Sequence, residues 1–262
     1  MLGHILLSKL ISNNTFEVYD ITRRKENRIN NFSCDVTNFN SLNEIIIQIK
    51  PDCIINCIGV LIKGSKEEPS NAILINAVLP HKLVQFSKSI NAKLIHISTD
   101  CVFDGYKGSY IESDFKTAQD TYGLSKSLGE IKDDKNLTLR TSIIGPEIKE
   151  STEGLFSWFL SQNGEVNGYT GSIWGGVTTT ALSDVIIKCI EGDYIGLLHV
   201  TNGIPISKYN LLSLIKDQFD LENITLIKVL GKKSDKSLNS TYNYFDIPSY
   251  ENMLSDMKKY YN

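Results

Sequence analysis

The chain has 262 residues, of which 41% are hydrophobic and 22% are charged, enough to bury the core of one α/β domain or of a large domain with a smaller attachment. Its formal net charge of −3 at pH 7 argues against a nucleic-acid partner, because no surplus of Lys and Arg is present to neutralise phosphates. No apolar run approaches the length of a membrane span and no segment resembles a signal peptide, so we expect a cytoplasmic protein with no membrane partner.

Helical and strand-like stretches alternate over the first part of the chain. The sequence predicts helices over 2–11, 41–49, 71–90 and 121–132, and strands over 16–21, 53–58, 93–98 and 137–142. Continuous apolar strands that alternate with helices are typical of a parallel sheet covered on both faces. We therefore predict an α/β fold with a doubly wound parallel sheet.

The character of the chain changes beyond about residue 146. The sequence predicts an aromatic-rich helix over 154–160, a glycine-rich loop over 164–176, helices over 180–190 and 207–219, and a strand over 196–200. We therefore divide the chain into residues 1–145 and a smaller C-terminal part, residues 146–262, which is interleaved with the first.

Polar residues and glycines follow three of the predicted strands, at 56–59, 98–100 and 141–144. In a parallel sheet, ligands bind in the crevice beyond the carboxyl ends of the strands. These three strand ends therefore predict one ligand-binding crevice.

A phenol and an ammonium group stand four residues apart at Tyr122 and Lys126, on one face of a predicted helix. A neighbouring ammonium group lowers the pKa of a phenol, so this tyrosine can act as a proton donor. Thr99 ends the preceding strand and can polarise the same substrate oxygen. Together they predict proton transfer at a carbonyl or carbinol oxygen, which is half of a ketone reduction; the other half requires a hydride donor.

Five segments resemble the extended short-chain dehydrogenase/reductase superfamily, in particular its dTDP-4-dehydrorhamnose reductase branch. They are 51–59 (PDCIINCIG), 76–77 (NA), 98–105 (STDCVFDG), 122–126 (YGLSK) and 139–145 (LRTSIIG). The resemblance implies a Rossmann-type sheet in residues 1–145 and a catalytic triad of Thr99, Tyr122 and Lys126. In that triad Tyr122 would donate the proton, Lys126 would lower its pKa and hold the nicotinamide ribose, and Thr99 would orient the substrate oxygen.

The same resemblance implies a nicotinamide cofactor. Asp20, at the end of a predicted strand, would suit the ribose hydroxyls of NAD, whereas Arg23 and Arg24 would suit the 2′-phosphate of NADP. NADP is preferred and NAD stays open. The other cofactor contacts that we expect, besides Tyr122 and Lys126, are Gly3, Asp35, Val36, Cys57, Ile58 and Gly59.

Gly3 is expected to be the last glycine of a Gly-x-x-Gly-x-x-Gly turn, whose backbone N–H groups hold the pyrophosphate. The sequence opens on Met1 without the first strand and the first two glycines of such a motif. Three explanations stay open: a start codon assigned too far downstream, a degenerate protein, or a truncated fold that is completed by a partner. The first is favoured, because the downstream motifs are intact.

The C-terminal part would close over the crevice and bind a nucleotide sugar, with substrate contacts expected at Thr99, Asp100, Trp174 and Val177. Related 4,6-dehydratases carry Thr-Asp-Glu, but Cys101 follows Asp100 here, and a thiol cannot replace that carboxylate in water elimination. The resemblance therefore implies NAD(P)H-dependent reduction of the C4 ketone of a nucleotide-linked 4-keto-6-deoxy sugar, for cell-surface polysaccharide synthesis.

Two other functions stay open. A nucleotide-sugar epimerase of the same superfamily would carry the same triad. A non-catalytic NADP-binding regulatory subunit is the second, because the regulatory beta subunit of methionine adenosyltransferase shares this fold branch. The missing glycines favour a regulatory subunit and the intact triad opposes it. The sequence leaves the sugar and the nucleotide base undecided, and a homodimer is one assembly open to the chain.

The cysteines are odd in number and several stand inside predicted strands, which suits reduced, buried thiols. They are Cys34, Cys53, Cys57, Cys101 and Cys189. Cys53 and Cys57 have no accompanying Cys or His ligands, so no metal site is expected.

Overall fold

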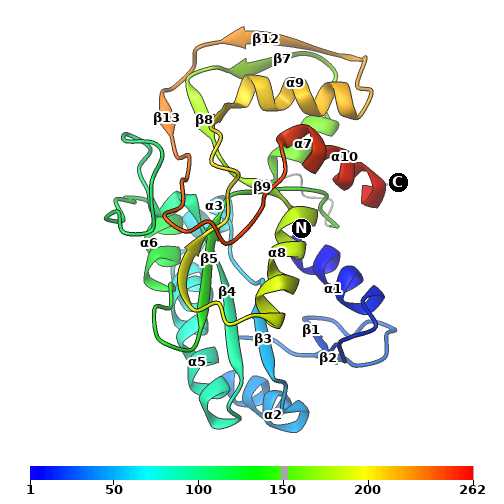
Figure 1. Ribbon diagram of the computed structural model, residues 1–262, viewed down its shortest axis with the longest axis vertical. Coiled ribbons are helices and arrows are strands. Elements are labelled where there is room, and N and C mark those ends of the chain that lie inside the picture. The colour runs from blue at the N-terminus through cyan, green and yellow to red at the C-terminus, as the bar shows by residue number, and fades with distance from the viewer. Residues whose placement is uncertain (149–152, 262) are drawn as a thin grey trace.

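The computed structural model describes residues 1–148 and 153–261 and is built around a four-stranded sheet (Figure 1). Its strands, in spatial order, are β10 (Gly196–His199), β5 (Leu137–Thr141), β4 (Lys93–Thr99) and β3 (Cys53–Asn56). All three pairings are parallel. The carboxyl ends of the strands therefore meet at one edge, as the sequence predicted.

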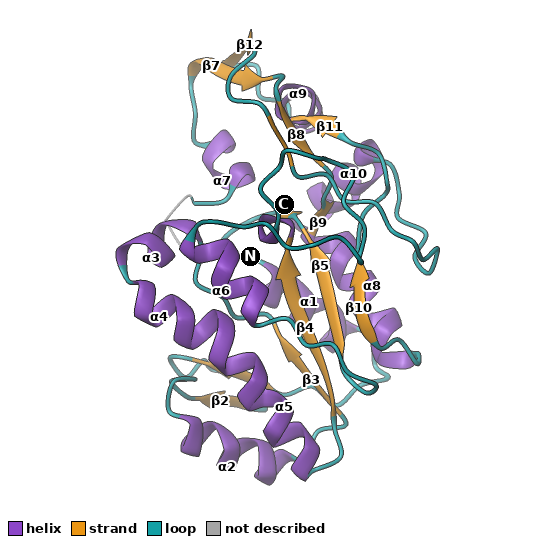
Figure 2. Cartoon of the chain, turned by 90° about the vertical axis from the view of Figure 1, so that its left-hand side faces the viewer, coloured by secondary structure: helices purple, strands orange, loops and turns teal. Residues whose placement is uncertain are grey.

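Helices cover both faces of this sheet (Figure 2). One face carries α2 (Phe39–Ile49) and α5 (Leu79–Ser89), and the other carries α1 (Leu2–Ser12) and α8 (Thr179–Glu191). Apolar side chains of β4 point to both faces of the sheet. Leu94 packs in the hydrophobic cluster formed with α2 and α5, whereas Ile95 and Ile97 pack in the cluster formed with α1 and α8. The expected doubly wound α/β fold is confirmed.

Side-chain caps set the beginnings of several of these helices. The Asn38 side chain accepts a hydrogen bond from the Ser41 backbone at the start of α2, and Thr178 does the same for Ala181 at the start of α8. Asp120 caps α6 (Thr121–Leu128) by accepting from the Gly123 backbone N–H at 2.9 Å. Each cap satisfies a backbone donor that the helix leaves unpaired.

A second parallel sheet contains β1 (Asp20–Thr22) and β2 (Asn31–Ser33), and no described strand links it to the larger sheet. The strand expected over 16–21 was therefore wrong in its first four residues, which have no strand beside them in the part of the chain described. Strand β3 consequently lies at the edge of its sheet, although Cys53, Ile54 and Ile55 form the kind of apolar run that is usual for a central strand.

Further short strands and three further helices, most of them in the C-terminal part, lie at the carboxyl edge of the sheet (Figure 1). The strands are β6 (Ile143–Ile144), β7 (Gly164–Tyr169), β8 (Ser172–Trp174), β9 (Val177–Thr178), β11 (Ile206–Ser207), β12 (Ile224–Val229) and β13 (Ser234–Asp235). The helices are α7 (Leu155–Leu160), α9 (Lys208–Gln218) and α10 (Tyr250–Tyr261). The glycine-rich loop expected over 164–176 was wrong, because β12, distant in sequence, supplies a parallel partner along the whole of β7.

The helix predicted over 71–90 is present as three successive segments that follow α3 (Ile62–Glu67). They are α4 (Pro69–Ile73), the π-helical η1 (Leu74–Val78) and α5. No helix in residues 1–148 and 153–261 is long and apolar enough to cross a lipid bilayer.

Helix α6 lies unusually close to η1. It ends at Leu128, four residues earlier than predicted, and a Cβ at the following Gly129 would collide with the carbonyl oxygen of Asn76. The absence of a side chain at Gly129 therefore allows α6 to dock on η1.

We expect Gly129→Ala to lower the free energy of unfolding by about 1–3 kcal/mol, because the backbone of Asn76 would have to move. The φ of −80° at Gly129 suits any residue, so the cost is steric. Urea denaturation checks this, with Gly3→Ala as control, because a Cβ there would meet its nearest neighbour at an ordinary 3.8 Å. Equal stability of the two variants would contradict the steric account.

Candidate active site

The structure brings Thr99, Tyr122 and Lys126 to the carboxyl end of β4. Thr99 is the last residue of β4, and α6 carries Tyr122 and Lys126 against it. A side-chain hydrogen bond joins Thr99 to Tyr122. The Thr99 hydroxyl also donates to Asp100 Oδ1 at 3.1 Å and accepts from the Cys101 backbone N–H at 3.2 Å, at the start of the 3₁₀ turn η2 (Asp100–Val102).

Lys126 is deeply buried, with only 4% of its surface exposed. Its Nζ donates to the carbonyl oxygen of Ile97 on β4 at 2.7 Å. Burial lowers the pKa of Lys126 to about 8, while the charges of Glu130 and of a Cys57 thiolate would raise it. The ammonium form therefore persists at neutral pH in a largely dry environment.

The pKa of Tyr122 is raised above its usual range, mainly by burial and further by the acidic groups of Cys101, were it ionised, and of Asp100, whereas its hydrogen bond with Thr99 lowers it. The sequence led us to expect that Lys126 would lower this pKa, and the structure differs because desolvation dominates. Tyr122 is consequently a neutral phenol at working pH, which is the form that can give up a proton to a ketone oxygen.

Burial also raises the pKa values of the two residues that follow Thr99. Burial and the charge of Asp100 raise the pKa of the Cys101 thiol to about 12. Burial raises the pKa of Asp100, against the positive charge of Lys236 and hydrogen bonds from its neighbours. Cys101 is therefore a neutral thiol and offers no carboxylate-like base beside Tyr122.

The turn after β3 is tied to α6 by Asn76 of η1, which is fully buried. Its Oδ1 accepts from the Val60 backbone N–H at 2.8 Å, and its Nδ2 donates to the Val60 carbonyl at 3.0 Å and to Ser125 Oγ at 3.1 Å. Gly59 lies between these contacts, and a Cβ there would approach Asn76 Oδ1 to 3.4 Å. Sequence reasoning noted residues 76–77 only as a point of resemblance and missed this role.

The same edge of the sheet holds three of the other expected cofactor contacts. A Cβ at Gly3, in the first turn of α1, would lie 3.8 Å from Cβ of Cys57. The Ile58 backbone N–H donates to Asn56 Oδ1 at 3.1 Å. Cys57 is close enough to α6 for the charge of Lys126 to act on its thiol, whereas Asp20 lies in the separate β1–β2 sheet.

Asp20 is already engaged within the chain. Its Oδ2 accepts from Arg28 Nη2 at 2.6 Å and from Asn31 Nδ2 at 2.7 Å. Arg23 and Arg24 follow β1 and are exposed. Sequence reasoning missed Arg28 and Asn31, because their proximity to Asp20 depends on the pairing of β1 with β2.

Asp35 and Val36 follow β2 in the chain. Backbone and side-chain hydrogen bonds from Thr37 lower the pKa of Asp35, and the charge of Arg23 contributes to the same shift. Val36 packs against the core cluster between α2 and α5.

Trp174 and Val177, expected to contact the substrate, have packing roles in this structure. Trp174 is 6% exposed, donates from Nε1 to Ser142 Oγ at 2.8 Å and packs against Tyr250. Val177 is fully buried and pairs with Ile143. Their substrate contacts stay a prediction.

A polar hollow of about 430 Å³ opens beside the start of α6. Two segments before and at the start of α6 contribute Phe103, Asp104, Tyr106, Ala118, Gln119 and Asp120 to its lining. The segment around β13 contributes Lys232, Ser234 and Lys236. The two lysines were missed from the sequence, because only the tertiary structure brings the segment around β13 to α6.

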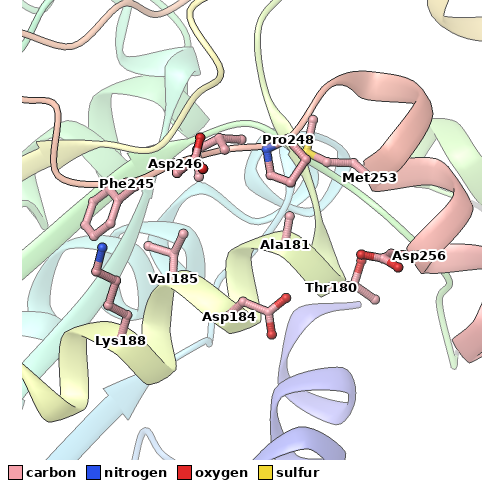
Figure 3. Close-up of a pocket in the computed structure, with 11 residues that line it drawn as sticks. Thr180, Ala181, Asp184, Val185, Lys188, Phe245, Asp246, Pro248, Met253 and Asp256 are labelled. Atoms are coloured by element: carbon pink, nitrogen blue, oxygen red, sulfur yellow. The ribbon is translucent and has the colours of Figure 1, made fainter.

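A second hollow, of about 230 Å³, lies between α8, the segment 245–248 and α10 (Figure 3). It contains none of the predicted site residues, and Lys9 of α1 pairs with its Asp184. The candidate active site is therefore the one at the end of β4. Among the described residues, no group of three or more His, Cys, Asp or Glu side chains could hold a metal ion.

Comparisons with known proteins identify the family of the chain. A family model described as the RmlD substrate binding domain matches residues 1–236. The chain is similar to the dTDP-4-dehydrorhamnose reductase of Aggregatibacter actinomycetemcomitans, with 30% identity over 248 residues that cover 87% of this chain and 81% of the relative.

Two solved structures are similar over most of the chain. One is a hypothetical dTDP-4-dehydrorhamnose reductase from Sulfolobus tokodaii, with a TM-score of 0.75 and 30% identity, covering 90% of this chain and 88% of the other. The second is a dTDP-4-dehydrorhamnose reductase from Bacillus anthracis in complex with NADP, with a TM-score of 0.82 and 22% identity, covering 100% and 96%. The second likeness shows a shared fold and confirms the expected Rossmann-type architecture.

We expect Asn76→Ala to destabilise the protein by about 2–4 kcal/mol, because Val60 and Ser125 would lose buried hydrogen-bond partners. It should also weaken NADPH binding, since the turn around Gly59 would lose its anchor. Asn136→Ala is the matched control, because Asn136 is equally buried and bonds the Leu94 backbone at the opposite end of β4. Thermal denaturation and a fluorescence titration of NADPH check both effects; equal NADPH affinity in the two variants would contradict the anchoring role.

Proposed function

This chain belongs to the family of the RmlD substrate binding domain, and from that membership we propose that it reduces the C4 ketone of a nucleotide-linked 4-keto-6-deoxy sugar with NADPH. The observation that carries the proposal is the meeting of Thr99, Tyr122 and Lys126 at the end of β4. The dTDP-4-dehydrorhamnose reductase of A. actinomycetemcomitans makes a dTDP-4-keto sugar the first substrate to test. The product would serve cell-surface polysaccharide synthesis in the cytoplasm.

The residues at the edge of the sheet fit a nicotinamide nucleotide. Within the described chain only one partner, the Ile97 carbonyl, is recorded for the three N–H donors of the Lys126 ammonium, so two donors are open to ribose hydroxyls. The exposed Gly59 leaves room for close approach at the turn after β3. NADPH, when bound, supplies the hydride.

NADP is favoured over NAD by the surroundings of Asp20. Arg28 and Asn31 already bind this carboxylate, so it is less free to accept hydrogen bonds from ribose hydroxyls. Arg23 and Arg24 are exposed in the loop between β1 and β2, and guanidinium groups suit a 2′-phosphate. NAD stays a second cofactor to test.

The chain's own residues supply the proton. Thr99 would hold the C4 oxygen by hydrogen bonding, and Tyr122 would pass its phenolic proton to that oxygen as negative charge develops there. Lys126 would stabilise the resulting phenolate. The neutral thiol of Cys101 cannot act as the base that water elimination requires, which separates this site from that of a dehydratase.

The nucleotide sugar would enter the polar hollow beside α6. Lys232 and Lys236 provide positive charge suited to a diphosphate, and Asp100 lies close enough for the charge of Lys236 to act on it. Residues 1–145 would then bind the cofactor and residues 146–262 would bind the sugar nucleotide. An epimerase with the same triad would interconvert sugars without net consumption of NADPH, so the assay separates the two.

We expect Tyr122→Phe to reduce turnover by about 10²–10⁴-fold, because the proton donor is lost. NADPH affinity should change little, since the cofactor contacts stay in place. Initial rates of NADPH oxidation with dTDP-4-keto-6-deoxy sugars, and a separate NADPH titration, check both expectations. Tyr194→Phe, remote from the site, is the control; undiminished turnover in Tyr122→Phe would sink the assignment.

We also propose a homodimer formed through the outer face of three helices that pack against one another, α3, α4 and α6. Four large apolar side chains are exposed on them: Ile62, Ile73, Leu124 and Leu128. Leu128 is 65% exposed and Ile62 is 62% exposed. Packing against a second copy of the chain would remove these apolar side chains from water.

We expect the double variant Ile73→Glu/Leu124→Glu to shift the protein from dimer to monomer, because charges would be buried at the interface. Light scattering coupled to size-exclusion chromatography measures the mass. Ile29→Glu, at a 92% exposed position in the loop between β1 and β2, is the matched control. A native protein that is monomeric at high concentration would refute this assembly.

A further inference from the structure

A buried ion pair lies directly behind the catalytic helix. Glu130 follows α6 by two residues, and its carboxylate receives two hydrogen bonds from Arg140 of β5, at 2.8 Å from Nε and 2.7 Å from Nη2. The exposed fractions of the two side chains are 3% and 2%. Burial raises the pKa of Glu130, but Arg140, Ser98 and the charge of Lys116, whose Nζ lies 3.3 Å from Oε2, outweigh it, so the carboxylate is ionised.

Arg140 is fixed from its other side as well. Its Nη1 lies 2.8 Å from Nε2 of His199 on β10, and Nδ1 of His199 lies 2.7 Å from the carbonyl oxygen of Asn239. Burial and the charge of Arg140 lower the pKa of His199, so its ring is neutral. A neutral ring that donates from Nδ1 can accept from Arg140 at Nε2, and the guanidinium is therefore held in one position.

Glu130 also bonds the strand that ends in Thr99. Ser98, the residue before Thr99, donates from Oγ to Glu130 Oε1 at 2.7 Å. One residue earlier, the Ile97 carbonyl accepts from Lys126. Two successive residues of β4 are thus bonded to α6 or to the residues that follow it, immediately before the proposed catalytic threonine.

We propose that Glu130 is a positioning residue, which fixes the helix of Tyr122 and Lys126 against the strand of Thr99 and keeps Lys126 in its ammonium form. This inference rests on the proposed function, in which those three residues act on substrate and cofactor. A buried ion pair adds little net stability compared with apolar residues of the same volume. The positions of its partners, on β4 and β5, point instead to a role in alignment.

The electrostatic part of the role follows from the groups around Lys126. Glu130 is the carboxylate whose charge raises the Lys126 pKa, against a burial effect that lowers it to about 8. The other titratable groups near Lys126 are the neutral phenol of Tyr122 on the same helix, the Cys57 thiol and the neutral ring of His96, whose pKa the charge of Lys126 helps to lower. Lys116 also bonds α6, at the Ser127 carbonyl, and pairs with Glu130.

The elements packed against α6 add few other charges. Lys63, Lys66 and Glu67 of α3 are exposed, whereas η2 contributes the buried Asp100 and half-buried Cys101. Neither α4 nor η1 carries a titratable side chain. On β4 the charged residue is Lys93, which bonds backbone carbonyls at the opposite end of the strand. Glu130 is therefore the group whose removal should change the Lys126 pKa most.

Two variants separate alignment from charge. Glu130→Gln removes the charge, so the Lys126 pKa should fall below about 8 and the alkaline limb of the kcat/KM profile should move to lower pH. Ser98→Ala keeps the charge and removes the bond to β4, so kcat should fall, on the order of tenfold to a hundredfold, with the alkaline limb unmoved. Ser183→Ala, which removes a buried hydroxyl bond inside α8, is the control with unchanged kinetics.

NMR titration of ¹³C-labelled lysine reads the Lys126 pKa without turnover, with assignment from Lys126→Met. If Glu130→Gln fails to fold, Ser98→Ala, which keeps both buried charges, still tests the alignment. An unchanged Lys126 pKa in folded Glu130→Gln, or unchanged kcat in Ser98→Ala, would overturn the proposal. Absence of reductase turnover in the native protein would instead refute the proposed function, while the titration would still decide the effect of Glu130 on Lys126.

Discussion

The docking of α6 on β4 is the contact on which the site depends. A buried ammonium group must be satisfied, and Lys126 meets this requirement by bonding the backbone of the strand that ends in Thr99. The approach is possible because Gly129 lets α6 lie against η1, and Asn76 of η1 joins the same helix to the turn after β3. The proposed proton donor, the proposed contact with the nicotinamide ribose and the proposed cofactor turn are therefore placed by one packing arrangement.

Burial sets the protonation states at this contact. It raises the pKa values of Tyr122 and Cys101 and lowers that of Lys126, so each group is driven towards its neutral form. Lys126 stays charged at neutral pH because a carboxylate, Glu130, lies nearby. A neutral phenol next to a cation is the arrangement that ketone reduction needs, since the phenol gives up its proton and the cation then stabilises the phenolate.

The fold alone does not select this chemistry, because reductases, epimerases and dehydratases of the superfamily are built on the same sheet. We propose that the selection is made by single side chains at the carboxyl ends of strands, of which Cys101 after Asp100 is one. Substrate selection would depend on the C-terminal part, since Lys232 and Lys236 reach the hollow beside α6 from the segment around β13.

Local sequence determined the parallel α/β core and the triad, because both depend on short-range patterns: apolar runs of strand length, helical spacing between Tyr122 and Lys126, and polar residues at strand ends. The tertiary structure alone decided the features that join distant residues. Strand β7 forms because β12 pairs with it, despite a glycine-rich sequence typical of a loop. Trp174 is buried against Tyr250, and Glu130 meets Arg140 and Ser98 across the sheet. Such contacts depend on how strands and helices assemble in space, and no residue spacing along the chain encodes that assembly.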